Sequence, residues 1–266
     1  MIHPVAQIAA LTCHANAFLQ DYRPVSFPMS NSTAQFCKAI SFKNPLSFFS
    51  IGKVLADNPD AWFRQLKRRH AIGVQLTRRP GLPTPLAASF IDGGGSWCME
   101  VYFPNRVDER WYSKWTVTDQ NAADKRIWSV EYNATTRLRL RKVCAPDLHT
   151  ITETLEASLR NIHTFAQGHS LRHFVENFGD ALNTIQTRGN ARHGYHQDLA
   201  PEGFLSDSAA VLLDASQKAW VFGGMGSWND LAFEGEEQQS YEKLSKQLLT
   251  AVNQAIAGAA SSTFRS

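Results

Sequence analysis

The chain has 266 residues, of which 43% are hydrophobic and 19% charged, and its formal net charge is +3. This composition is that of a globular protein with a sizeable core, and it excludes a disordered chain. The mildly basic charge is well short of that of a dedicated nucleic-acid-binding protein and argues against a nucleic-acid partner. Since no apolar run approaches the ~18–20 residues that a transmembrane helix needs, we also expect no membrane span.

The N-terminal 20 residues and the cysteines indicate the cellular compartment in which the protein is found. The N-terminal stretch places apolar residues at helical spacing but lacks the basic start of a secretory signal, so it predicts an amphipathic helix of the mature protein. The cysteines are scattered, without a Cys-x-x-Cys pair, which favours reduced thiols over disulfides. These features predict a cytoplasmic protein. The four cysteines are Cys13, Cys37, Cys98 and Cys144.

Alternating apolar and polar residues predict strands in the middle of the chain. The pattern covers Ala71–Arg79, Arg110–Thr118 and Arg126–Tyr132, and two further strands are expected on either side of the glycine turn Asp92–Ser96. Together these stretches predict an antiparallel meander of about five strands. The preceding segment, Asp21–Phe49, contains three prolines and predicts irregular structure.

Helical spacing dominates the last third of the chain. Leu148–Phe165 and Leu171–Ile185 predict an αα-hairpin, and a C-terminal helix is expected from about Glu236. Two short apolar runs between them, Ala209–Asp214 and Ala219–Phe222, predict a β-hairpin. The predicted fold is α+β, with an antiparallel sheet of about five to seven strands packed against the αα-hairpin and the C-terminal helix.

One domain over residues 1–266 is the preferred organisation, because no linker or internal repeat divides the chain. A subdivision near residue 145 stays open. It would separate a mainly β part with N-terminal helices (1–145) from a part with the helical hairpin, the β-hairpin and the C-terminal helix (146–266).

The glycine-rich loop that follows Ala219–Phe222 is the first candidate site. Its glycines permit positive φ and close approach of another group, and its free N–H groups could face an anion. The loop matches neither a dinucleotide fingerprint nor a P-loop. The structural alternative is a tight turn in which Trp228 fills the core and Asn229 or Asp230 caps a helix. The candidate ligand-binding residues of the loop are Gly223, Gly224, Gly226, Ser227, Trp228 and Asn229.

The unperiodic segment 190–207 is the second candidate site, because long loops without secondary structure are often functional. His193, His196 and Asp198 could converge on a metal ion, since three protein ligands and a water form the catalytic zinc pattern. Either histidine could instead act as a general base, paired with Asp230 if the two loops meet at one end of the sheet. Tyr195 is the candidate ligand-binding residue of this segment.

Three classes of function remain open from the sequence. The first is a non-catalytic protein that binds a small molecule or a protein partner through loops 190–207 and 223–230. The second is a hydrolase- or lyase-like enzyme that uses His193 or His196 with a carboxylate, with or without the help of a metal ion; no nucleophile motif supports it. The third is a scaffold whose surface aromatic residues serve self-association. The sequence identifies no cofactor.

Overall fold

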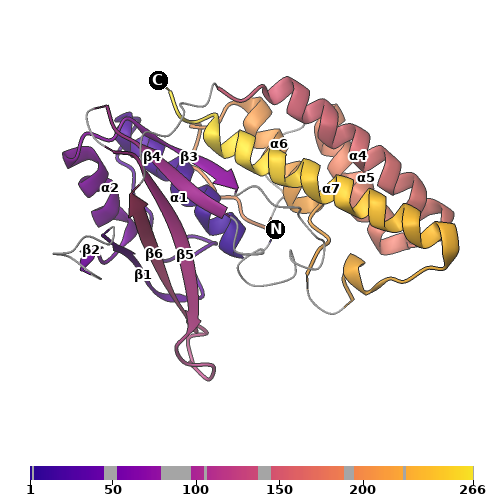
Figure 1. Ribbon diagram of the computed structural model, residues 1–266, viewed down its shortest axis with the longest axis horizontal. Helices are drawn as coiled ribbons and strands as arrows, with labels where there is room; N and C mark the ends of the chain where they lie inside the picture. Colours follow the sequence, from indigo (N-terminus) through magenta and orange to yellow (C-terminus); the bar gives the residue numbers. More distant parts are fainter. Residues whose placement is uncertain are drawn as a thin grey trace.

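The computed structural model describes residues 1, 3–44, 53–78, 97–104, 107–136, 145–188, 195–223 and 226–265. These residues form a mixed α+β fold (Figure 1). The helices are α1 (His3–Leu19), α2 (Pro59–Arg68), α4 (Leu148–Gly168), α5 (Arg172–Thr187), α6 (Asp207–Lys218) and α7 (Gly235–Ser261), with a short 3-10 helix, η1 (Trp228–Asp230). The strands are β1 (Cys37–Lys43), β2 (Val54–Ala56), β3 (Gly73–Arg78), β4 (Trp97–Tyr102), β5 (Glu109–Val117) and β6 (Trp128–Thr136).

The six strands form one sheet in the order β2-β1-β6-β5-β4-β3. Strands β1 and β6 run parallel and the other neighbours run antiparallel, so the prediction of a purely antiparallel sheet is wrong. The parallel neighbour of β6 is β1, which lies within the proline-containing segment that was expected to be irregular. Pro24, Pro28 and Pro45 flank Cys37–Lys43 without interrupting it, so the strand keeps its backbone donors.

The strands expected at residues 71–79, 110–118 and 126–132 are confirmed as β3, β5 and β6. The second strand of the hairpin expected around Asp92–Ser96 is confirmed as β4. The turn itself and the strand expected before it lie outside the described residues. Helix α2 begins at Asn58-Pro59-Asp60, where the Asn58 side chain caps it by accepting a hydrogen bond from the Ala61 N–H.

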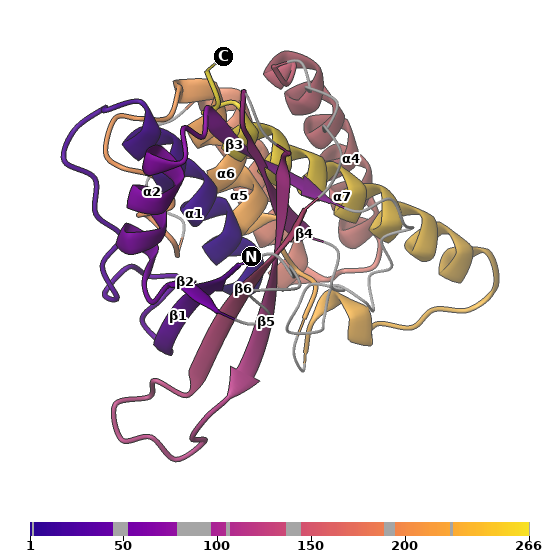
Figure 2. The same ribbon diagram turned by 60° about the vertical axis from the view of Figure 1, so that its left-hand side comes forward.

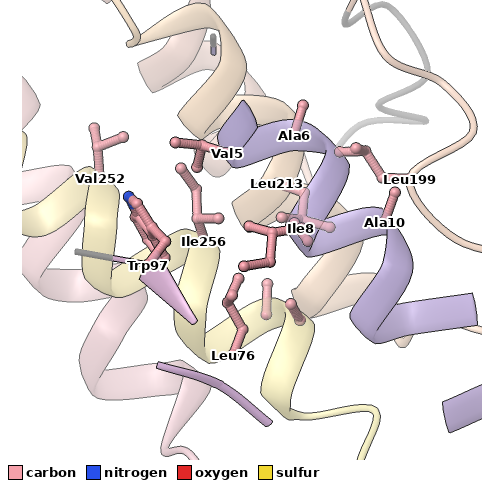
Figure 3. Close-up of a cluster of buried hydrophobic side chains, with 14 of the residues drawn as sticks. Val5, Ala6, Ile8, Ala10, Leu76, Trp97, Leu199, Leu213, Val252 and Ile256 are labelled. Atoms are coloured by element: carbon pink, nitrogen blue, oxygen red, sulfur yellow. The ribbon is translucent and has the colours of Figure 1, made fainter. Parts of the chain in front are cut away.

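Helix α1 is the centre of the core rather than an amphipathic surface helix. Every residue from Pro4 to Ala17 is buried, and the helix contacts β3, β4, α2 and α7. Figure 3 shows Ile8 of α1 lying among Leu76 of β3, Leu213 of α6 and Ile256 of α7. Because its polar residues are buried too, their hydrogen bonds determine how the sheet and the helices are joined.

The two successive helices α4 and α5 are confirmed, but they do not form the main cover of the sheet. They pack on α7 and α6, while α1, α2 and α7 contact the strands. The helices α4 to α7 accordingly form a bundle of their own, at the end of the molecule away from α2 (Figures 1 and 2). The C-terminal helix, expected from about Glu236, begins at Gly235.

The expected β-hairpin at residues 209–222 is wrong, because Asp207–Lys218 is a single helix, α6. Ser206 caps it, its hydroxyl accepting from the Ala209 N–H at 3.3 Å. Seven residues of α6 are buried, namely Ala209 and the six residues from Val211 to Ser216. A helix that is buried on most sides gives a short continuous apolar run, and such a run resembles a buried strand in sequence.

Candidate functional site

The glycine-rich loop is a closed turn between α6 and α7. The Trp228 N–H donates to the Val221 carbonyl at 3.1 Å and so brings the two ends of the loop together. Gly223 has φ 143° and Gly226 has φ 77°. Both values lie in the region that side chains disfavour, so glycine is required at these two positions by the backbone itself. Gly224 lies outside the described residues.

Two backbone donors of this loop, which were expected to face an anion, are occupied by the chain's own carboxylate. Asp230 Oδ2 accepts from the N–H groups of Gly226 at 2.6 Å and Ser227 at 3.1 Å, while the Ser227 hydroxyl accepts from the Asn229 N–H at 3.3 Å. These bonds form a capping box around η1. Asp230 thus caps a helix, but that helix is η1; α7 begins later, after Glu234.

Trp228 fills the helical core, as the structural alternative predicts. Its ring is fully buried and meets the rings of Phe174 and Phe178 edge-on at 5.0 and 5.3 Å. The indole N–H donates to the Ser245 hydroxyl at 2.7 Å, and the Tyr241 hydroxyl donates to the Trp228 carbonyl at 2.5 Å. The loop therefore fixes α7 against α5 through one aromatic residue.

The second loop brings together three residues that we call the Ser32 junction: Ser32, His196 and Asp198. Ser32 Oγ lies 2.8 Å from His196 Nδ1 and also donates to Asp198 Oδ1. The Ser32 N–H donates to Asp198 Oδ2 at 2.7 Å. His196 is buried and the other two residues are half-buried. A hydroxyl, an imidazole and a carboxylate thus converge from segments 164 residues apart.

The direction of each hydrogen bond in the Ser32 junction follows from the number of hydrogens that each group can donate. A serine hydroxyl carries one hydrogen, and here that hydrogen points to the carboxylate of Asp198. The contact with His196 is then made by the imidazole, which donates its Nδ1–H to Ser32 Oγ. In a serine nucleophile the hydroxyl donates to the imidazole instead. This arrangement therefore holds the loop in place and does not activate Ser32.

Further hydrogen bonds hold the backbone of His196 and Asp198 in place. The backbone N–H of His196 donates to the Gln217 side chain at 2.9 Å, and Gln217 Nε2 donates back to the His196 carbonyl at 3.2 Å. Gln217 lies in the last turn of α6, six residues before Gly223 of the glycine-rich loop. The Asn31 amide also donates to the Asp198 carbonyl at 2.9 Å.

Tyr195 lies at the rim of the junction. Its side chain is 66% exposed, yet its hydroxyl accepts from Gln35 Nε2 at 3.2 Å and its ring meets that of His196 edge-on at 4.8 Å. Gln35 itself donates to the Ser32 carbonyl at 3.1 Å. The junction thus fixes an exposed aromatic side chain in one orientation.

A second histidine, His14 of α1, lies within electrostatic reach of Asp198. It is 5% exposed, its Nδ1 lies 2.9 Å from the Ala10 carbonyl, and its ring meets Phe27 edge-on. Burial lowers the pKa of His14, and the hydrogen bond to Ala10 and the carboxylates of Asp198 and Asp60 oppose this shift. His14 is therefore held as a neutral imidazole.

The three thiols that the structure describes are buried and have raised pKa values. Cys13, Cys37 and Cys98 are buried free thiols, as the scattered spacing predicts, and Cys144 lies outside the described residues. Burial raises the pKa of Cys13 to about 12 and that of Cys37 to about 11. Both therefore remain protonated, and a protonated thiol is neither a nucleophile nor a metal ligand.

The metal hypothesis and the acid/base hypothesis stay predictions. His193 lies outside the described residues, and within the described ranges no three His, Cys, Asp or Glu side chains are grouped as metal ligands. Both carboxylate oxygens of Asp198 accept hydrogen bonds from Ser32. The hydrogen bonds of Asp230 lie within its own turn, and no finding tests its pairing with His196.

The sequence analysis missed Ser32, Gln35 and Gln217. Ser32 and Gln35 belong to the segment expected to be irregular, and Gln217 to the residues expected to form a hairpin turn. Their partners in the segment 195–198 lie 21 to 166 residues away along the chain. No periodicity signals such contacts. The polar triplet that begins at Asn31, shortly after Pro28, was the only local signal.

A cavity of about 360 Å³ lies elsewhere, at the corner between α4 and α5. Its lining residues are Gln167, Ser170, Arg172, Val175 and Glu176. None of the candidate site residues contributes to it. Among the described residues, moreover, no helix has both the length and the apolar character needed to cross a membrane.

The fold and the two loops define a mixed α+β protein with one closed structural turn and one polar junction. Comparison with protein-family models, with curated proteins and with solved structures gives no match for this chain.

Proposed function

We propose that this chain is a non-catalytic binding protein and that it contacts a protein partner through Tyr195 and the adjoining surface of the Ser32 junction. The observation that carries the proposal is that Tyr195 is 66% exposed while its hydroxyl and its ring are both held, by Gln35 and His196. Among the described residues no other large apolar side chain is as exposed.

An immobilised exposed tyrosine lowers the cost of binding. Association normally costs conformational entropy at each interface side chain that becomes ordered. Tyr195 has lost much of that freedom before any partner arrives, because Gln35 and the buried His196 already hold it. Tyrosine is also enriched among the residues that dominate protein–protein affinity.

A protein partner fits this surface better than a small molecule. Small-molecule sites are concave pockets, whereas the cavity at the α4–α5 corner is lined by other residues. The glycine-rich loop, the other half of the predicted site, binds its own Asp230 through its backbone donors. We therefore centre the binding surface on Tyr195 rather than on Gly223–Asp230.

The proposal is tested by incorporating a photo-crosslinking amino acid in place of Tyr195 in the cells that produce the protein. The matched control carries the same amino acid in place of Val54, another exposed apolar residue (56% exposed). We expect a discrete adduct from position 195 that is absent from position 54 and that weakens when Gln35→Ala releases the ring. Equal patterns from both positions, or no adduct from position 195, would contradict the proposal.

The hydrolase- or lyase-like alternative is favoured by one observation, the convergence of Ser32, His196 and Asp198. It requires the Ser32 proton to move from Asp198 to His196, the reverse of the arrangement described above. A fluorophosphonate probe labels serines that a base activates. Labelling of Ser32 that disappears in Ser32→Ala would establish the enzyme; we expect the wild-type protein to remain unlabelled.

A further inference from the structure

The turn that joins α4 to α5 shapes the cavity at their corner. The Leu171 N–H donates to the Ala166 carbonyl at 3.0 Å and the Ser170 N–H to the Gln167 carbonyl at 3.1 Å, which are the two hydrogen bonds of a Schellman motif. This motif ends α4 and turns the chain into α5. The end of α4, the turn and the start of α5 consequently line one cavity of about 360 Å³.

Ser170 stands where this motif usually has glycine. Its φ is 58°, in the left-handed region that a side chain disfavours. A glycine would therefore make the same turn at a lower cost in free energy. The serine instead places an exposed hydroxyl group in the lining of the cavity. It thus weakens the turn and adds a polar group to the cavity.

Arg172 is a second residue that opposes its local structure. It is the first residue of α5, and the first turn of this helix holds no acidic residue. A positive charge is unfavourable near the N-terminus of a helix, where the helix dipole favours anions. Departures from local preference are expected mainly at functional sites. Two such departures, Ser170 and Arg172, line the same cavity.

Arg172 and Glu176 bring opposite charges to the cavity without neutralising each other. They stand one turn apart on α5 and both are exposed, yet neither forms an ion pair with the other or with any further residue of the described ranges. Glu156 and Arg160, one turn apart on α4, do pair, at 2.6 Å. The acid precedes the base in that pair, which is the favourable order on a helix, and Arg172 and Glu176 have the reverse order. Both charges of the cavity therefore face solvent.

The spacing of these charges indicates the chemistry of a ligand. Residues three and four apart are neighbours on a helix, so Arg172, Val175 and Glu176 share one face of α5, and the Cβ atoms of the two charged residues are about 5–6 Å apart. A ligand that meets both must carry an anionic and a cationic group close together. An α-amino acid carries both on one carbon atom. A guanidinium group binds a carboxylate through two parallel hydrogen bonds, and the half-buried Val175 offers an apolar contact.

We propose that the cavity at the α4–α5 corner binds a free α-amino acid with an apolar side chain. Arg172 binds its carboxylate, Glu176 binds its ammonium group, and Val175 contacts its side chain. The Ser170 hydroxyl and the Gln167 amide donate further hydrogen bonds to the carboxylate. The site shares no residue with the Ser32 junction and does not depend on the function proposed there.

Titration monitored by NMR tests the proposal with three compounds. They are L-leucine, N-acetyl-L-leucine, which keeps only the negative charge, and L-leucinamide, which keeps only the positive charge. We expect L-leucine to shift the backbone amide resonances of residues 167–176 and to bind about threefold more tightly than either blocked compound, because each lacks one exposed ion pair. Equal affinities for the three compounds, or no shift of these resonances by L-leucine, would overturn the proposal.

Charge-removing variants assign each group of the ligand to its partner. Arg172→Gln should weaken the binding of L-leucine and N-acetyl-L-leucine about threefold and leave that of L-leucinamide unchanged. Glu176→Gln should weaken the binding of L-leucine and L-leucinamide and leave that of N-acetyl-L-leucine unchanged. Arg188→Gln, at the other end of α5, is the control. A loss that is equal for all three compounds, or no loss at all, would overturn the proposal.

The variant Ser170→Gly separates binding from stability. It should raise the midpoint of thermal unfolding, because glycine adopts a φ of 58° without strain. It should also weaken L-leucine binding about threefold, because one hydrogen-bond donor is lost. Unchanged binding by the variant would overturn the part assigned to the hydroxyl. A lowered unfolding midpoint would overturn it too, because the turn itself would then require the serine.

Discussion

The ring of Phe264 lies directly over Gly73 of β3, so that a Cβ built on Gly73 would stand 1.8 Å from Phe264 Cδ2. The same ring lies 5.6 Å from that of Tyr102 on β4. Just before it, Thr263 accepts hydrogen bonds from Asn16 and Gln20 of the α1 end, at 2.8 and 2.7 Å. The C-terminal residues thus tie α7 across the edge strand to α1.

Gly73→Ala is therefore expected to displace the Phe264 ring and to lower the free energy of unfolding by about 1–3 kcal/mol, the usual cost of overpacking. Phe264→Ala alone should cost a similar amount. In the double variant the second substitution should add little to the loss of unfolding free energy, because the first has already removed the contact between Gly73 and Phe264. Urea unfolding measures all three. Additive costs would show that Gly73 is required for another reason, and Gly168→Ala, with no neighbour within 4 Å, is the control.

Asn16→Ala is expected to destabilise the protein by about 3 kcal/mol, because it leaves the buried N–H and C=O of Val74 without partners. Thr12→Val is the matched control on the same buried helix. The Thr12 hydroxyl bonds only to the Ile8 carbonyl, one turn away, and the change should cost less than about 1 kcal/mol. Equal losses in thermal or urea unfolding would show that the hydrogen bonds between Asn16 and Val74 do not account for the cost.

Two ion pairs of the sheet should differ in their contribution to stability. Glu109 is 2% exposed and binds Arg69 with both carboxylate oxygens and the Trp111 indole N–H with one. Glu109→Gln should cost about 2–4 kcal/mol, since the charge of Arg69 loses its partner. Glu131→Gln breaks the half-exposed pair with Lys43 and should cost less than about 1 kcal/mol. Similar values for the two variants in urea unfolding would contradict this ranking.

His14 makes the protein less stable in mild acid. Since burial lowers its pKa below the ordinary value of 6.5, the unfolded chain takes up a proton on His14 before the folded chain does. Its contribution is complete above pH 6.5 and is lost as the pH falls toward the lowered value. Between pH 7.5 and 5.5 the loss is at most about 1.4 kcal/mol. His14→Gln should shrink this drop in urea unfolding at the two pH values.

Local sequence patterns predicted the strands and helices that bury only one of their faces. Alternation located β5 because it has a single core-facing side, and the spacing of Leu155, Leu159 and Ile162 located α4 for the same reason. Strand β3 shows the same alternation of residue types although Gly73–Leu76 are all buried. Helix α6 was mistaken for strands because its residues 211–216 are buried in succession, a pattern that both structures share.

Contacts distant in sequence could not be predicted. The Ser32 junction joins residues 164 and 166 positions apart, and no spacing rule relates them. The glycines at 223 and 226 did indicate positive φ, and both adopt it. Whether such a turn faces a ligand or a side chain of its own depends on tertiary structure, and here the N–H groups of Gly226 and Ser227 meet Asp230.

The most direct test of the account is the affinity of the partner captured at position 195, measured by titration calorimetry with the wild-type protein and with Tyr195→Ala. Val54→Ala is the control for an exposed apolar residue away from the junction. If Tyr195 anchors the interface, its loss should cost about 2 kcal/mol, or about 30-fold in Kd, while Val54→Ala binds like the wild type. Equal Kd values for Tyr195→Ala and the wild type would contradict the claim that the Ser32 junction presents Tyr195 for binding.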